Sequence, residues 1–428
     1  MRRGATKWRV SLVTSALIIA TSNAQASGLS PIMGALGETK PLIDARLRYE
    51  YVDQAGVGTA ATYHPADAEI FRLRLGFETG KAWNTSLLAE GEFVTPLRTD
   101  YRPDNAVATK TNFPVVADPE AYELNRLQLV NSSLPDTTLT VGRQRINLDD
   151  QRFVGAAGWR MNEQTFDAVR VVNKTVPNLT FDLTYLDRVN RVYGPDSPQG
   201  TWKGDSYLAN VAYQTTFGKV TGFAYLLDFN PVKYFGNTAF NPVRSSSQTY
   251  GVRFAGDRAL SKIKLSYAAS YATQSDWERS PLHYSDDYFL AEVYATYRQF
   301  TLGGGYEQLQ GNGTVGFATP LATLHKFQGW ADKFLTTPAN GIDDTYGSFT
   351  YLLKGVGPLD TLSATATYHD YQTERRNQDL GHEWNYQLQA KYQRLVGIVK
   401  YASYVAGNTT PATYRNTTKF WVELDFVW

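Results

Sequence analysis

The stretch Thr418-Lys419-Phe420-Trp421-Val422-Glu423-Leu424-Asp425-Phe426-Val427-Trp428 closes the chain and decides the fold. Its even positions carry Phe, Val, Leu, Phe and Trp, whereas Lys419, Glu423 and Asp425 stand at odd positions. Successive side chains of a β-strand point to opposite faces, so this strand has one apolar face and one largely charged face. A strand of an outer-membrane barrel has this pattern, because one face contacts lipid and the other contacts water. The terminal Trp428 fits the aromatic girdle at the membrane interface.

The N-terminus predicts export from the cytoplasm. A basic segment with Arg2, Arg3, Lys7 and Arg9 precedes the apolar stretch 10–20, and the small-x-small sequence Ala24-Gln25-Ala26 follows. The apolar stretch is too short for a membrane-spanning helix, which needs about 20 residues. We therefore expect a cleavable signal peptide at residues 1–26 and a single barrel domain at 27–428, located in the outer membrane of a Gram-negative bacterium.

The composition of the chain excludes several classes of protein. Cysteine is absent, so neither disulfides nor thiolate metal sites can hold this exported chain. Removing residues 1–26 would remove four basic residues and no acidic one, so the net charge would change from +1 to about −3. That balance does not favour nucleic acid as a partner. The mean hydropathy of −0.36 and the 14% aromatic content suit strands with one wet face and interfacial aromatic residues.

Alternation of apolar and polar residues recurs along the chain and predicts an all-β, transmembrane, antiparallel up-and-down barrel of about 18 strands. Each run is near the length of about 9–11 residues that a tilted membrane strand needs. The runs near 137–146, 165–173 and 395–404 alternate poorly. The expected strands lie near 42–52, 69–79, 83–94, 121–130, 137–146, 165–173, 179–188, 206–215, 219–229, 247–256, 261–271, 286–297, 299–308, 345–354, 360–370, 382–392, 395–404 and 415–428.

The connections between these runs support the same architecture. With the first strand running outward, most odd-numbered connections are long and most even-numbered ones are short, which matches long outer loops and short periplasmic turns. An even number of strands leaves both termini in the periplasm. The expected partners are outer-membrane lipids and the barrel-assembly machinery, which would engage the C-terminal strand ending in Trp428, and a monomer is the expected state.

A barrel of this size is too wide for side chains to fill, so its lumen must hold water, a plug or folded loops. Arginine and lysine in a channel wall favour anions. The cluster of Arg46, Arg48, Arg72 and Arg74 on the first two strands predicts an electropositive wall, or alternatively a wall stabilised by pairing with nearby glutamates. Further basic residues expected along the channel are Arg126, Arg170, Arg253, Lys264 and Lys391.

The segment 142–167 is the first of two unusual connections. It reads GRQRINLDDQRFVG and continues to Trp159-Arg160 and Thr165-Phe166-Asp167. The strand period breaks at Gly142, and a β-bulge there would turn Arg143 inward. Its density of charge predicts either a loop folded into the lumen as a constriction or a salt-bridged loop base without solute contact. The candidate constriction residues are Arg143, Arg145, Arg152 and Asp167.

The segment 319–344, in the longest outer connection, is the second. It contains ATLHKFQGWADKFL at 322–335 and is too rich in Leu, Phe and Trp to extend into solvent. We expect it to pack against the mouth or the inner wall of the barrel.

These two segments resemble the outer-membrane alginate-export family, in the block GRQR…D-x-R-F-V-G…W-R…T-F-D at 142–167 and in ATLHKFQGWADKFL…P…G…D…Y at 322–346. The resemblance implies an 18-stranded barrel with an arginine-lined lumen that passes an anionic polysaccharide or a related uronate. It also implies that His325, Trp330 and Asp332 of the second block serve in loop packing or in the constriction.

Catalytic and metal sites find little support in the sequence. The five histidines, His64, His283, His325, His369 and His382, form no recognisable hydrolase or metalloprotease motif. An outer-membrane lipase with isolated Ser and His is an alternative of much lower weight. Asn340, Asp343 and Asp344 offer oxygen ligands for Ca²⁺, but an ordinary Asn-Gly turn is favoured. We therefore expect neither enzyme activity nor a cofactor.

The sequence thus predicts an outer-membrane channel that passes anionic saccharides, alginate-like polyuronate or smaller carboxylates, by passive diffusion. The alternatives are an uptake porin for neutral or aromatic solutes and a non-conducting structural or adhesion barrel.

Overall fold

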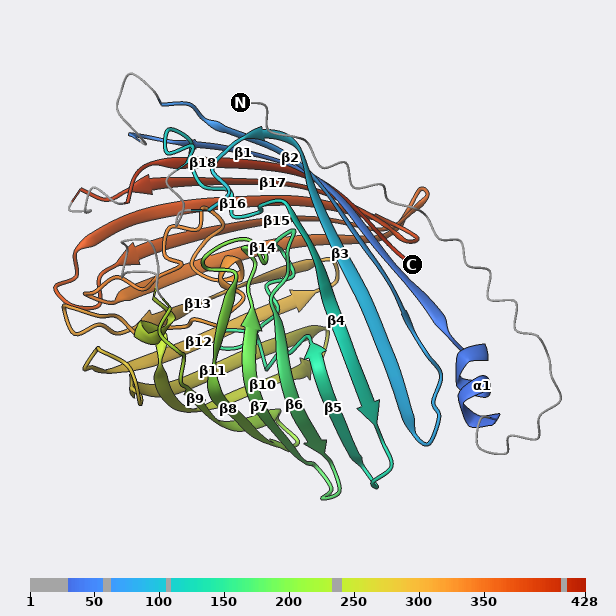
Figure 1. The fold of residues 1–428 in the computed structure, drawn as a ribbon. Helices are drawn as coiled ribbons and strands as arrows, with labels where there is room; N and C mark the ends of the chain where they lie inside the picture. The colour runs from blue at the N-terminus through green and yellow to red at the C-terminus, as the bar shows by residue number, and fades with distance from the viewer. Residues whose placement is uncertain (1–29, 57–62, 105–108, 233–240, 409–413) are drawn as a thin grey trace, which may run out of the picture.

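The protein is an 18-stranded antiparallel β-barrel (Figure 1). The structure, a computed structural model, describes residues 30–56, 63–104, 109–232, 241–408 and 414–428, so the expected signal peptide lies outside the described residues. The strands are β1 (Lys40–Gln54), β2 (Ala66–Glu78), β3 (Thr85–Asp100), β4 (Ala121–Asn131), β5 (Thr137–Gln144), β6 (Thr165–Asn173), β7 (Leu179–Asn190), β8 (Thr201–Gln214), β9 (Lys219–Leu227), β10 (Ser247–Leu260), β11 (Ile263–Asp276), β12 (Ser285–Tyr297), β13 (Phe300–Leu309), β14 (Ile342–Val356), β15 (Leu359–Gln372), β16 (Asp379–Tyr392), β17 (Leu395–Ala406) and β18 (Thr417–Val427).

The barrel closes between its first and last strands. Every strand pairs with its sequence neighbours, and β1 also pairs with β18, with Arg48 opposite Glu423. The predicted strand number and up-and-down topology are confirmed, including the three runs that alternate poorly, which form β5, β6 and β17. Neighbouring strands supply all backbone hydrogen bonds in such a ring, which is what a lipid environment requires.

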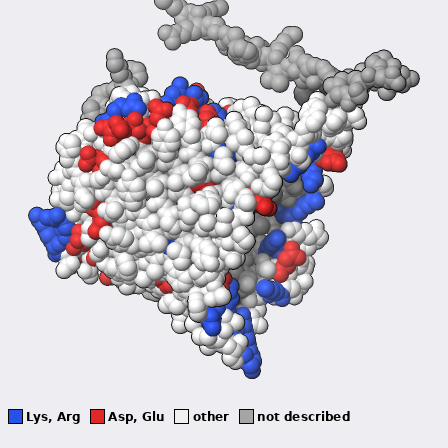
Figure 2. Space-filling model, turned by 90° about the horizontal axis from the view of Figure 1, so that it is seen from below, with Lys and Arg blue, Asp and Glu red and all other residues white. Residues whose placement is uncertain are grey.

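The outer wall of the barrel is apolar. Leu388 of β16, Val293 of β12 and Leu302 of β13 are 50%, 53% and 65% exposed, although each sits between buried or half-buried neighbours. Figure 2 shows one face of the molecule as an almost unbroken surface of uncharged residues, with charged side chains gathered at its margins. Such a band is the surface that a membrane barrel presents to lipid.

The interior is not empty, because two long connections fold into it. The first inner loop, residues 145–164, joins β5 to β6, and the second inner loop, residues 310–341, joins β13 to β14 and includes the 3-10 helix η3 (Leu324–Lys326). Figure 1 shows both inside the ring of strands. Val154 of the first and Leu321 of the second form a parallel β-bridge and belong to a buried cluster that also includes inward-facing wall residues such as Phe223 and Tyr404.

Two short helices complete the described part of the chain. The helix α1 (Ser30–Gly37), which the sequence analysis did not anticipate, precedes β1 and accepts a hydrogen bond at Ala35 O from Gly80 N in the β2–β3 turn. The 3-10 helix η2 (Pro242–Ser245) lies between β9 and β10. Among the described helices, none has the length and apolar character needed to cross a membrane.

Candidate functional site

The candidate site is the lumen. Its wall carries a cluster of paired charged side chains on β1, β2 and β18. Arg46 donates from Nε to Asp425 Oδ1 at 2.6 Å, and Arg48 donates from Nε to Glu423 Oε2 at 2.6 Å. The register of β1 against β18 places each arginine opposite its partner. These arginines, expected to line an anion path, therefore carry their own counterions.

The same holds for the two arginines of β2. Arg72 pairs with Asp44, and Arg74 pairs with Glu92 of β3 and, at 3.3 Å, with Asp44. Both guanidinium groups are almost fully buried. The geometry agrees with the alternative that this cluster stabilises the wall, through Glu92 and Glu423 together with the aspartates Asp44 and Asp425.

Arg126 and Arg145 continue this pattern on β4 and at the start of the first inner loop. Arg126 Nη2 lies 2.7 Å from Glu90 Oε2, and Arg145 Nε lies 2.5 Å from Glu163 Oε1. Glu163 belongs to the first inner loop, so Arg145 links the beginning of that loop to its end. On β6, Arg170 pairs with Asp182 of β7 at 2.5 Å.

Arg143 and Asp167 do not lie in the lumen. Gly142 has the positive φ of 116° that an added side chain would strain, but the pairing of β5 with β4 and β6 runs through Arg143 without a shift of register. Arg143 therefore leaves β5 on the same outer face as the exposed Val141, and Asp167 shares that face of β6 with Val169. The expected inward turn does not occur, and a constriction role does not fit this placement.

The outer ion pair instead covers a notch in the wall. Because β5 is short, β4 pairs with it only from Leu127 onward. Arg143 bonds Asp167 at 2.7 Å and donates from Nη1 to the carbonyl oxygen of Leu124 at 2.8 Å. It thus bonds a backbone group of β4 at a level where β4 pairs with β3 but no longer with β5.

The first inner loop crosses the lumen to the opposite wall. Arg152 Nε lies 2.7 Å from Glu307 of β13, and Asp150 forms an ion pair with Arg253 of β10 at 2.8 Å. The neighbouring Asp149 accepts from Lys219 of β9 at 2.7 Å. Arg152 and Arg253, predicted as channel residues, are thus buried anchors of this loop.

Lys264 and Lys391 occupy a different environment. Both lie on the inward face of their strands close to the short-turn end of the barrel, and both are exposed. Lys264 pairs with Asp257 at 3.2 Å, and more than half of each side chain is exposed. Ion pairs that are this exposed to solvent contribute little to stability.

The second inner loop is fastened to the wall by His325, Trp330 and Asp332. The imidazole of His325 lies 2.8 Å from Asp332 through Nδ1 and 2.9 Å from Lys400 Nζ through Nε2. The Nζ atom of Lys400 lies 3.8 Å from the ring centroids of both Trp330 and Trp159, the geometry of a double cation–π contact.

The electrostatics of this cluster favour a neutral imidazole and an ionised carboxylate. Burial, followed by the charge of Lys400, holds the pKa of His325 well below its usual range. Burial alone would raise the pKa of Asp332, but the charges of Lys419, His325 and Arg160 hold it well below its usual range. Asp332 accepts from Lys419 and Arg160 at 2.8 and 2.9 Å, so one carboxylate joins three elements.

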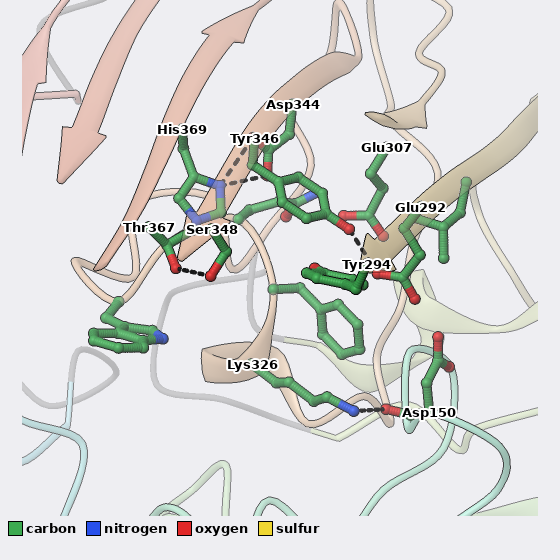
Figure 3. A pocket seen from close by; sticks show the side chains of 14 residues that line it. Asp150, Glu292, Tyr294, Glu307, Lys326, Asp344, Tyr346, Ser348, Thr367 and His369 are labelled. Atoms are coloured by element: carbon green, nitrogen blue, oxygen red, sulfur yellow. Dashed lines mark hydrogen bonds and ion pairs between the residues drawn. The ribbon is translucent and has the colours of Figure 1, made fainter. Parts of the chain in front are cut away.

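Two of the cavities beside the inner loops are relevant to the site. The deep cavity, of about 240 Å³, lies against the middle of β12–β15 (Figure 3). Its lining includes Glu292, Glu307, Asp344, Lys326 and Trp330.

In the deep cavity, the carboxylates are engaged by neighbours, as the contacts of Glu292 with Tyr346 and of Asp344 with His369 show. Lys326 lies at the other end of the cavity from His369, beside Asp150 (Figure 3). It bonds the carbonyl oxygen of Asp150 at 2.8 Å, and no described carboxylate lies within ion-pairing distance of it.

The outer cavity, of about 290 Å³, lies at the long-loop end of the barrel, which faces the cell exterior in barrels of this class. The ends of β1 and β18, the β3–β4 connection and the second inner loop line it. Its charged lining residues are Arg102, Arg160, Asp332, Lys333 and Lys419.

Three residues of this region were not predicted from the sequence to belong to the site: Trp421, Lys400 and Lys333. Trp421 is fully buried on the lumen face of β18. An aromatic residue on that face indicates that another segment packs against it inside the barrel. Trp421 contacts Trp159 with ring centroids 6.0 Å apart. Lys400 and Lys333 gave no comparable signal, since lysine on a lumen face is ordinary. The described residues hold no group of three His, Asp or Glu side chains suited to a metal.

Comparisons with known proteins agree with this architecture. The family described as alginate export has a model that matches residues 127–276, which include the first block but not the second. No curated protein matches the chain.

Three solved outer-membrane proteins of Pseudomonas aeruginosa share the fold. OpdK, crystallised with vanillate, is 14% identical with a TM-score of 0.67, over 92% of this chain and 100% of its own. OpdQ is 15% identical with a TM-score of 0.65, over 92% and 99%. OccK11 (OpdR) is 14% identical with a TM-score of 0.64, over 92% and 97%. The chain therefore has the fold of these solved barrels, and its resemblance to the alginate-export family is confirmed for residues 127–276.

Proposed function

We propose that this protein is a passive diffusion channel for small anionic solutes, of the acidic-saccharide or carboxylate class. The observation that carries the proposal is the folding of both inner loops into the lumen, where they meet at Val154 and Leu321. The deep and outer cavities beside these loops have volumes of about 240 and 290 Å³, which suit small molecules better than a polymer chain.

The anionic preference rests on lysines rather than on the arginine wall. The arginines of β1 and β2 are neutralised by carboxylates, whereas Lys326 in the deep cavity and Lys333 in the outer cavity have no described carboxylate within ion-pairing distance. The alginate-export match adds support for an anionic solute. The structural neighbour OpdK was crystallised with vanillate, a small aromatic carboxylate, which supports the small-solute reading.

The proposal includes export through the signal peptide at residues 1–26, insertion through the C-terminal strand ending in Trp428, function as a monomer and no catalytic role. An uptake porin for neutral or aromatic solutes is the second candidate, because aromatic side chains line the deep cavity.

Liposome swelling tests the proposal and its rival together. Proteoliposomes would be placed in solutions of glucuronate, its longer oligomers, neutral glucose or benzoate. We expect glucuronate to enter fastest and its oligomers to enter progressively more slowly. Faster entry of glucose or benzoate than of glucuronate would favour the second candidate, and no entry of any solute would indicate a non-conducting barrel.

A further inference from the structure

The outer cavity contains more positive than negative charge. Four basic side chains line it, Arg102, Arg160, Lys333 and Lys419, against the single carboxylate of Asp332. That carboxylate already accepts from Arg160, Lys419 and His325 at 2.8–2.9 Å. It is thus committed to holding the second inner loop, and its charge offsets that of Lys333 only in part.

Lys333 is held in place by uncharged partners only. Its Nζ donates to Thr417 Oγ1 at 2.8 Å and to Gln54 Oε1 at 3.1 Å. An ammonium group has three N–H donors, so one remains after these two bonds. No carboxylate among the described residues lies within ion-pairing distance of it.

Burying a cation without a counterion costs free energy, and this cost lowers the pKa of the group. Burial, followed by repulsion from Lys419, lowers the pKa of Lys333 to about 7. An anion beside Nζ would reverse this effect, because an opposite charge favours the protonated form.

We propose that the outer cavity is a binding site for one carboxylate group of a small solute, with the ammonium group of Lys333 as its counterion. The inference rests on the proposed function for the identity of the solute, and it adds the residue that first captures it. The neighbouring Arg160 and Lys419 supply attraction at longer range, while their bonds to Asp332 keep them in place.

The site is sensitive to pH in the neutral range. Since the pKa of Lys333 is lowered to about 7, the side chain is charged below that pH and becomes neutral above it. Carboxylate binding is therefore strong on the acid side and is lost as pH rises through this value. The other charged groups around Lys333 are Lys419 of β18, Asp332 of the second inner loop, Arg160 of the first, Arg102, Arg415, Glu50 of β1 and Glu383 of β16.

Variants at Lys333 show whether the pH dependence of binding comes from Lys333 itself or from the nearby carboxyl groups of Glu50 and Glu383. Lys333→Met removes the ammonium group, and Lys333→Arg keeps a charge that does not titrate in this range. Lys81→Met is the matched control, because Lys81 lies in the β2–β3 turn, bonded to Ser132 Oγ at 2.8 Å, far from the cavity. Folding of each variant is checked by the heat-modifiable electrophoretic shift of the full-length protein.

The experiment is calorimetric titration of the refolded protein in detergent with glucuronate, with inorganic phosphate and neutral methyl glucoside as further probes. We expect wild type and Lys81→Met to bind glucuronate about tenfold more weakly at about pH 8.5 than at about pH 6. Lys333→Met should bind about tenfold more weakly at the lower pH, and Lys333→Arg should bind without pH dependence.

Three results would overturn the inference. They are wild-type affinity in Lys333→Met, an unchanged pH dependence in that variant, and binding of phosphate or methyl glucoside in place of glucuronate. Failure of the proposed function looks different. If Lys333 governs glucuronate binding but the protein conducts no anions, the binding site is supported and the channel function is contradicted. If the protein conducts anions but Lys333→Met binds glucuronate like wild type, the channel function is supported and the binding site is contradicted.

Discussion

Val154 of the first inner loop and Leu321 of the second face each other in a parallel β-bridge inside the barrel, and both side chains are almost completely buried. Gly155 N donates to Leu321 O at 2.9 Å, and Gln164 Nε2 donates to the same oxygen at 3.0 Å. The two connections, far apart in sequence, therefore form one body inside the lumen, and under the proposed function this body sets the size of solute that can pass.

Leu321→Asp should separate the two inner loops. Burying an uncharged polar group without a partner costs roughly 2–7 kcal/mol, and an unpaired carboxylate in this apolar cluster costs more. The loops would leave the lumen while the strand ladder stays intact, and single-channel conductance should rise about twofold or more, as expected for a wider pore. Leu134→Asp, in an exposed turn, is the control. Equal conductance of the two variants would mean that this contact does not limit the pore.

Arg74→Met should weaken the barrel without altering its selectivity. The variant leaves Glu92 buried beside no counterion, and breaking such a pair costs about 3–5 kcal/mol. Urea unfolding in lipid vesicles measures the loss, and the double variant Arg74→Met with Glu92→Gln should recover much of it. Arg98→Met removes an exposed pair and serves as the control. A large shift of reversal potential in Arg74→Met would contradict this and would indicate that the arginine wall lines the anion path.

Arg143→Gln should also leave ion selectivity unchanged, because Arg143 lies on the outer wall. Losing its bonds to Asp167 and to the Leu124 carbonyl should reduce the free energy of unfolding by about 1–3 kcal/mol. Lys326→Met, in the deep cavity, is the comparison and should reduce anion preference. The placement of Arg143 would be contradicted by a selectivity shift as large as that of Lys326→Met.

Acidification should loosen the second inner loop through His325. Its pKa is lowered in the folded protein by burial and by Lys400, so the unfolded state binds protons first. The contribution of His325 is therefore complete above about pH 6.5 and is lost as pH falls below it, by about 1.4 kcal/mol per unit. Asp332, whose pKa is also lowered, loses its contribution only at pH values below the usual aspartate range, so the two effects separate.

The measurement is thermal unfolding of the detergent-solubilised protein between about pH 7 and about pH 5. Wild type should lose up to about 2 kcal/mol across this range, and His325→Gln should show a smaller slope. His283→Gln is the matched control, because His283 is exposed. Identical slopes in the two variants would remove His325 as the cause.

The sequence was sufficient for the barrel because period-2 alternation reports directly which face of each strand meets lipid. It could not report which residues face each other across strands distant in sequence. Arg48 and Glu423 are 375 positions apart, and their pairing follows only once the ring has closed. The sequence therefore left open whether the arginine wall is free or paired charge, and the structure shows that it is paired.

Local breaks in the pattern were harder to interpret. Gly142 was correctly singled out, yet its positive φ leaves the register unchanged and Arg143 on the outer face. The second inner loop could be predicted to pack inside because its apolar residues need cover. The role of Lys333 could not be predicted, because it depends on the absence of a described counterion in a cavity that segments distant in sequence build together.

Planar-bilayer recording of the full-length protein under a KCl gradient tests the central claim most directly. Small discrete openings whose reversal potential indicates anion preference, and which glucuronate blocks more strongly than glucose, are the predicted result. A cation-selective reversal potential, or a membrane that stays silent after verified insertion, would contradict the account.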